Sequence, residues 1–109
     1  MDPKESRVRQ VSYPTPGEIL LEEFLLPMGV TQYRLTKEIA VSQRRIGEIV
    51  AGKRAVTADT GLRLSRFFGL NDGFWTGLQA DHDGAVAKDA LADVLAGIRP
   101  WAANTYSPK

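Results

Sequence analysis

The sequence predicts an all-α fold, a bundle of five to six helices that contains a helix-turn-helix. Three observations support this prediction. Apolar residues recur at helical spacing along most of the chain, no segment alternates as a strand would, and capping residues, prolines and glycines divide the pattern into short elements. The 109 residues suffice for one domain with a modest hydrophobic core.

The first predicted helix covers residues 17–26 and follows a polar segment that contains prolines. Residues 1–13 are expected to form a flexible arm. In the helix, apolar side chains fall on one stripe and the glutamates face water. Pro27 and Gly29 are expected to end it, because proline lacks the N–H of the helical ladder and glycine readily takes a left-handed conformation.

Two short helices follow, joined by a turn. Thr31 is a candidate N-cap for a helix over residues 32–39, and Ser42 for a helix over residues 43–51. Gly52 is expected to stop the second of them. This layout is that of a helix-turn-helix, in which the second helix lies in the DNA major groove and reads bases with its N-terminal residues.

Further helices are predicted after the helix-turn-helix, over residues 58–68 and 72–80. A last amphipathic pattern runs over residues 84–98, either as a separate helix or as a continuation across residues 81–84. The expected division of the chain is an arm (1–13), a helix-turn-helix domain (14–83), a C-terminal helix (84–99) and a flexible tail (100–109).

Net charge is only +1, but the basic residues gather in the middle of the chain. Residues 31–66 hold eight basic and three acidic residues, a net charge of +5, whereas the flanking segments each carry −2. A local positive charge suits phosphate binding, and a solvated basic face is the alternative. The chain has no cysteine, no apolar run of membrane-spanning length and no apolar segment near its start, which suits a cytoplasmic protein.

Helical geometry divides the 43–51 helix into a core side and an exposed side. Arginine on the exposed side is not needed for stability, whereas arginine pairs bidentately with guanine and glutamine with adenine. Gly47 costs about 1 kcal/mol of helix propensity relative to alanine, which indicates close packing on another helix or close approach to DNA. The core side carries Ile46, Ile49 and Val50, the exposed side carries Arg44, Gly47, Glu48 and Ala51, and Gln43 and Arg45 lie on the flanks.

Candidate contacts to the DNA backbone surround this helix. Gln32 begins the preceding helix and Thr57 precedes the following one, and both helix starts offer free N–H groups to an anion. Lys53 and Arg54 follow the 43–51 helix in a turn, where a solvated surface is the alternative. Phosphate contacts set register and affinity, and base contacts set specificity.

Three stretches of the chain resemble the HigA-type antitoxins of bacterial toxin–antitoxin modules, a branch of the Cro/C1-type (Xre) helix-turn-helix family. They are PGEILLEEFLLPMG (16–29), VSQRRIGEIVAGKRAVTADTGLRLSRFFG (41–69) and FWTGLQADHD (74–83). The resemblance implies a lambda repressor-like, all-α repressor rather than an enzyme. Such a protein dimerises, binds a palindromic operator in double-stranded DNA at its own promoter, and neutralises a RelE-like ribonuclease toxin.

The pattern of that family assigns roles to individual positions and also shows where this chain departs from it. Base edges would be faced by Gln43, Arg44, Gly47 and Glu48. The phosphate backbone would be approached by Gln32, Ser42, Lys53 and Arg54, to which we add Arg45 and Thr57. The departures are Thr36 and Gly61, where alanine is usual, and Ala40, where glycine is usual. A left-handed alanine is disfavoured by about 1 kcal/mol, and the Thr36 hydroxyl can bond back to the carbonyl four residues earlier.

The apolar stripe of the last predicted helix is free for a second subunit, because five helices already supply the core. It consists of Leu91, Val94, Leu95 and Ile98. Dimers suit a recognition mode in which half-sites lie about one helical turn apart. No cofactor or metal is expected, since His82 is the single histidine and is interpreted as a solvated helix end. A stand-alone Xre-type regulator without a toxin partner is the alternative function.

Overall fold

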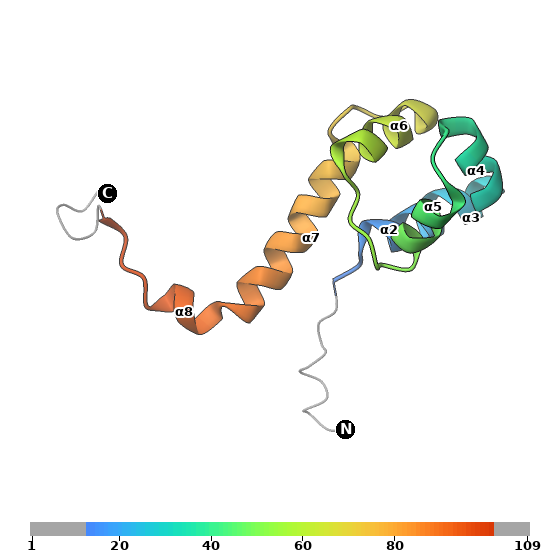
Figure 1. Cartoon of the computed structure of the whole chain (residues 1–109). Coiled ribbons are helices and arrows are strands. Elements are labelled where there is room, and N and C mark those ends of the chain that lie inside the picture. Colours follow the sequence, from blue (N-terminus) through green and yellow to red (C-terminus); the bar gives the residue numbers. More distant parts are fainter. Residues whose placement is uncertain (1–12, 102–109) are drawn as a thin grey trace, which may run out of the picture.

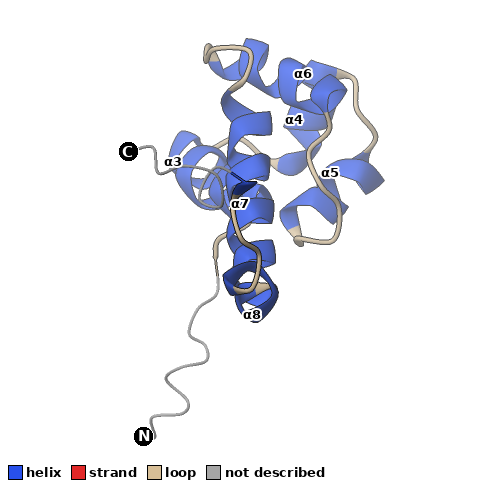
Figure 2. Cartoon of the chain, turned by 90° about the vertical axis from the view of Figure 1, so that its left-hand side faces the viewer, coloured by secondary structure: helices blue, strands red, loops and turns tan. Residues whose placement is uncertain are grey.

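The computed structural model describes residues 13–101, and every regular element in this range is a helix (Figures 1 and 2). The helices up to α6 gather at one end of the molecule, and α7 runs away from them toward α8 (Figure 1). The elements after the first helical run are α4 (Gln32–Ile39), α5 (Gln43–Val50), α6 (Ala58–Phe68), α7 (Phe74–Ala90) and α8 (Ala92–Ala96). The all-α prediction is therefore confirmed.

The first helical run begins at a capping box. The Thr15 hydroxyl oxygen accepts the Glu18 N–H at 3.1 Å, and the Glu18 carboxylate accepts the Thr15 N–H at 2.9 Å. Pro16 takes the first helical position, where its missing N–H costs nothing. The run comprises α2 (Pro16–Ile19), η1 (Leu20–Leu25) and α3 (Leu26–Met28).

The prediction that Pro27 ends the first helix is wrong, because Pro27 lies inside α3. In a regular α-helix its ring would clash with the carbonyl group of Glu23, four residues earlier. The hydrogen bonds of η1 reach one residue further back, since the Leu26 N–H donates to the Leu21 carbonyl oxygen. This π-helical spacing relieves the clash, and the run ends only at Gly29, whose φ of 68° is left-handed.

The three middle helices match the predictions closely. The bounds of α4 and α6 are those predicted, and α5 ends one residue earlier than expected. Thr31, Ser42 and Thr57 are the N-caps, and each hydroxyl oxygen accepts the backbone N–H three residues further on. Short polar residues before each apolar pattern were therefore reliable start signals.

The C-terminal helices follow the continuous alternative as far as Ala90. Helix α7 passes through residues 81–84 without a break and ends at Ala90, and its C-cap residue Leu91 has a φ of −104°. Of the two alternatives for residues 84–98, the structure shows the continuation through Ala90, which is followed by the short α8. Asp83 sits on a helix turn that a side-chain hydrogen bond supports, because Gln79 Nε2 donates to its carboxylate at 3.0 Å.

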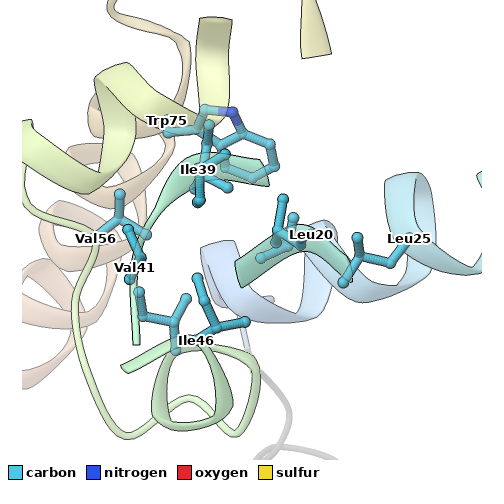
Figure 3. Packing of buried hydrophobic residues seen from close by; sticks show 10 residues of the cluster. Leu20, Leu25, Ile39, Val41, Ile46, Val56 and Trp75 are labelled. Atoms are coloured by element: carbon cyan, nitrogen blue, oxygen red, sulfur yellow. The ribbon is translucent and has the colours of Figure 1, made fainter. Parts of the chain in front are cut away.

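One hydrophobic core lies between the first run and α4, α5, α6 and the start of α7 (Figure 3). Among the described residues, no hydrophobic side chain after Trp75 is buried. The Phe24 ring lies 4.9 Å from that of Phe68 and 5.1 Å from that of Trp75, so these aromatic residues belong to the core. The buried hydrophobic residues are Leu20, Leu25, Leu35, Ile39, Val41, Ile46, Ile49, Val56, Leu64 and Trp75.

The segment before the first helix lies along α7. The Tyr13 hydroxyl donates to the Asp89 carboxylate at 2.9 Å, and His82 Nδ1 lies 3.1 Å from the Pro14 carbonyl oxygen. His82 is thus in the middle of α7 and not at a helix end as expected. The other residues of the predicted arm (1–12) and most of the predicted tail (102–109) lie outside the described residues. In the range that the structure covers, no helix is both long and apolar enough to cross a membrane.

Candidate nucleic-acid interface

The turn between α4 and α5 carries the strain that the sequence predicted. Ala40 has φ 58° and ψ 48°, and it is the only non-glycine residue with positive φ in the described part of the chain. Buried Thr36 satisfies its hydroxyl by donating to the Tyr33 carbonyl oxygen at 2.7 Å, three residues earlier rather than four. Neither departure from the family pattern prevents the two helices from packing.

A side chain from another helix holds this turn. Arg63 on α6 donates from Nη1 to the Ile39 carbonyl oxygen at 2.8 Å and to that of Ala40 at 3.4 Å. Its Nε also donates to Asp59 at 2.7 Å. Arg63 therefore caps the C-terminus of α4, where free carbonyl groups favour a positive charge. Sequence reasoning counted Arg63 only as one of the basic residues.

Helix α5 presents only part of the predicted exposed side, because Gly47 and Glu48 are half-buried. Ile46 and Ile49 are buried, Val50 is only half-buried, and Gln43 and Arg44 are exposed. A Cβ built on Gly47 would meet no atom of the described residues within 4 Å. Packing on another helix within the described residues therefore does not explain this glycine.

A second glycine fixes where the C-terminal end of α5 lies. A Cβ on Gly17 would overlap the carbonyl oxygen of Ile49 and come within 2.9 Å of the Val50 Cα. Helix α2 therefore contacts the backbone of α5 directly, which only glycine permits. The signal available in the sequence was a glycine in the first turn of a helix, where other residues have a better helix propensity.

The carboxylate of Glu48 lies between two arginines. Its Oε2 accepts from Arg44 Nε at 3.0 Å, and its Oε1 accepts from Arg54 Nε at 2.7 Å. These hydrogen bonds, that from Arg54 first, hold the pKa of Glu48 below its usual range. The Glu48 backbone also takes part, because its carbonyl oxygen accepts the Lys53 N–H at 2.8 Å. One residue thus connects the exposed edge of α5 to the basic turn that follows.

The residues predicted to contact phosphates lie around α5, and most of them are exposed. Gln32 is exposed at the start of α4, Lys53 and Arg54 are exposed in the turn after α5, and Arg45 is half-buried. The Ser42 and Thr57 hydroxyl oxygens accept capping N–H groups, which leaves each hydroxyl hydrogen free to donate.

A contact across the core anchors the segment between α5 and α6. The Val56 N–H donates to Gln79 Oε1 on α7 at 2.8 Å. Gln79 thus holds the segment that carries Lys53 and Arg54 against α7. Sequence reasoning missed this role, because the two residues are 23 positions apart.

The predicted dimer residues lie on and beside α8, away from the core. Leu91 and Leu95 are both 44% exposed, Val94 is 60% exposed and Ile98 is 61% exposed. In the part of the chain that the structure describes, no group of three or more His, Cys, Asp or Glu residues could hold a metal ion.

Comparison with known proteins gives this architecture a family. A helix-turn-helix family (HTH_3) matches residues 21–75. Virulence-associated protein I of Dichelobacter nodosus is 48% identical over 73 residues, which are 67% of this chain and 68% of that protein.

Solved structures of HigA antitoxins have the same fold. The Pseudomonas aeruginosa antitoxin HigA, solved with the higBA promoter, is 33% identical with a TM-score of 0.75, and the match covers 82% of this chain and 99% of that one. A HigA-family addiction module antidote protein of Coxiella burnetii is 35% identical with a TM-score of 0.75, over 83% of this chain and all of that one. The family match and these antitoxin structures, one of them solved with promoter DNA, confirm the prediction that the chain is not an enzyme. The chain belongs to the Xre-type helix-turn-helix family and, within it, to the HigA-type antitoxins.

Proposed function

We propose that this protein is a cytoplasmic, homodimeric autorepressor that binds a palindromic operator at its own promoter and also neutralises a RelE-like ribonuclease toxin. The observation that carries the DNA-binding part is the exposed edge of α5 beside an exposed basic turn. An arginine and a glutamine at the start of a helix match the major-groove edges of guanine and adenine.

The residues have distinct roles in this proposal. Gln43 and Arg44 reach base edges, and the missing side chain at Gly47 lets the DNA approach the helix backbone. Glu48 lies at the same edge. The contacts to phosphates come from Gln32, Ser42, Arg45, Lys53, Arg54 and Thr57.

The second subunit would pack on the exposed apolar stripe of α8. The stripe consists of Leu91, Val94, Leu95 and Ile98, and it carries hydrophobic side chains that the chain itself does not cover. A twofold pair of recognition helices reads a palindrome whose half-sites lie about one helical turn apart.

Binding to the DNA upstream of the protein's own gene tests this function. Fluorescence anisotropy should show tight binding to that DNA and much weaker binding to a scrambled duplex at the same salt concentration. Arg44→Ala should cost about 1–3 kcal/mol on the operator and relax specificity at one base pair, whereas Lys53→Ala should weaken both duplexes alike and lower the salt slope by about one. Equal binding of the wild-type protein to both duplexes would overturn the DNA-reading role.

The toxin part of the proposal rests on membership of the antitoxin branch and has its own test. The gene beside the one for this protein should encode a basic protein that co-purifies with it. The ribonuclease activity of that basic protein should disappear when the two proteins are mixed. If the neighbouring gene encodes no such protein, the chain is a stand-alone Xre-type regulator.

A further inference from the structure

The carboxylate of Glu48 is the only acidic group in the described residues that accepts from two arginines. Its side chain is 29% exposed, whereas that of Arg44 is 84% exposed and that of Arg54 is 43% exposed. Arg44 thus projects beyond Glu48 toward solvent. On the proposed DNA-binding edge, any base would meet the guanidinium before the carboxylate.

The atoms that form these ion pairs decide which part of Arg44 stays available. Arg44 uses Nε to reach Glu48, which leaves its two terminal NH2 groups free. Those two groups form a planar fork that matches O6 and N7 of guanine. Holding the side chain in this pose before binding reduces the rotamer entropy that Arg44 loses on the operator.

The same carboxylate offsets positive charge at the edge that faces phosphates. Arg44, Arg54 and Glu48 together carry a net charge of +1, where two unpaired arginines would carry +2. Binding to DNA of any sequence depends mainly on such charges, because it releases counterions from phosphates. Glu48 therefore weakens non-specific binding while it prepares Arg44 for a guanine.

We propose that Glu48 is a positioning residue that sets operator specificity through Arg44 and Arg54, and does not itself read a base. This inference rests on the proposed DNA-binding function. It changes the role that the sequence suggested for Glu48, which was direct contact with a base edge.

Glu48→Ala tests the inference, with Glu38→Ala as the matched control. Glu38 accepts from Arg34 Nε at 2.7 Å on α4, also four residues apart and exposed, so the control removes the same charge and the same kind of ion pair. Glu48→Ala should lower the ratio of operator to scrambled-duplex affinity by about tenfold or more. It should also tighten binding to scrambled DNA and steepen the salt dependence of that binding by about one. Glu38→Ala should change the ratio less than about threefold.

Two further measurements separate positioning from base reading. In an operator scan with single base-pair changes, Glu48→Ala should relax the same position as Arg44→Ala. In an Arg44→Ala, Arg54→Ala background, Glu48→Ala should cause no further loss of discrimination. Thermal unfolding of Glu48→Ala and of the milder Glu48→Gln verifies that both variants are folded.

Relaxation at a different base pair, or a loss that persists without the two arginines, would overturn the inference and make Glu48 a base reader. Glu48→Ala behaving like Glu38→Ala would also overturn it, although the wild-type protein still prefers its operator. If the wild-type protein prefers no sequence, the proposed function fails and the inference fails with it.

Discussion

Residues 15–79 and residues 80–98 are both mainly helical, but only the first region has a core of its own. The first region contains every buried hydrophobic residue of the described chain, from Leu20 to Trp75. The second region leaves Val86, Leu91, Val94, Leu95 and Ile98 exposed. In Figure 1 it projects from the bundle as the outer part of α7 followed by α8.

Under the proposed function, this difference separates DNA recognition in the first region from dimerisation in the second. Helices α4 and α5 must be held rigidly, because base reading depends on the position of each side chain. The outer part of α7 and α8 need only an apolar face, since a second subunit can supply the contacts that this chain lacks. Folding and pairing should therefore respond to different substitutions.

The largest effect on stability is expected at Gly17, where α2 contacts the backbone of α5. Gly17→Ala would place a Cβ on the Ile49 carbonyl oxygen, so α2 and α5 must separate, and the free energy of unfolding should fall by more than about 3 kcal/mol. Urea denaturation measures this change. The matched control is Gly77→Ala on α7, where a Cβ meets nothing within 4 Å among the described residues; it should stabilise by about 1 kcal/mol. Equal effects of the two changes would show that the contact between α2 and α5 is not tight.

The second largest effect concerns the pairing region. Leu95→Asp places a charge on the exposed stripe of α8 and should raise the dimer dissociation constant by about 100-fold or more. Sedimentation equilibrium measures it, and the unfolding of the separated chain should keep its cooperative transition. Leu26→Asp is the control, because Leu26 is also a largely exposed leucine but lies on α3. Loss of pairing in both variants would argue against a specific interface at α8.

Gly47→Ala should change the stability of the protein and its affinity for the operator in opposite directions. With no described atom near the new Cβ, helix propensity should raise the free energy of unfolding by about 1 kcal/mol. Operator affinity should nevertheless fall by about tenfold, since the methyl group occupies the place that DNA approaches. Calorimetry measures the change in the free energy of unfolding, and fluorescence anisotropy on the same sample measures the change in operator affinity. Unchanged affinity would mean that DNA does not approach this backbone closely.

The smallest effect is expected at the turn between α4 and α5. Ala40→Gly relieves a left-handed alanine at φ 58°, but glycine loses more chain entropy on folding, so the net stabilisation should be about 0.5–1 kcal/mol. Ala51→Gly is the control, because Ala51 has an ordinary φ of −77° and should lose stability instead. The same sign for both changes in urea denaturation would contradict a strained turn.

Local signals in the sequence predicted much of the first region. Thr31, Ser42 and Thr57 marked helix starts correctly because capping involves only neighbouring residues. The family pattern predicted the left-handed turn at Ala40 in the same way. The helix starts and the exposed start of α5 could therefore be predicted from the sequence.

The features that the sequence did not predict depend on residues far apart in the chain or on hydrogen-bond spacing. The hydrogen bond from Arg63 to the Ile39 carbonyl group joins residues 24 positions apart. The hydrogen bond between Val56 and Gln79 joins residues 23 positions apart. The path through Pro27 required a π-helical turn, which periodicity alone cannot indicate. The ion pair of Glu48 with Arg54 needed the turn after α5 to fold back toward the helix. The pair with Arg44 joins residues four apart on one helix, a spacing that the sequence itself offers.

The central claim is that the exposed stripe of α8 joins two chains, so that two helix-turn-helix units bind one operator. The most direct test is to measure how operator affinity depends on the spacing between the two half-sites. Anisotropy titrations would compare the natural operator with variants that carry five or ten extra base pairs at its centre. Half a helical turn puts the second half-site on the opposite face, so five base pairs should weaken wild-type binding by about 100-fold. Ten extra base pairs return the second half-site to the same face of the DNA and should weaken wild-type binding less. The Leu95→Asp variant should bind all three duplexes alike. Wild-type binding that does not depend on the spacing would contradict the account.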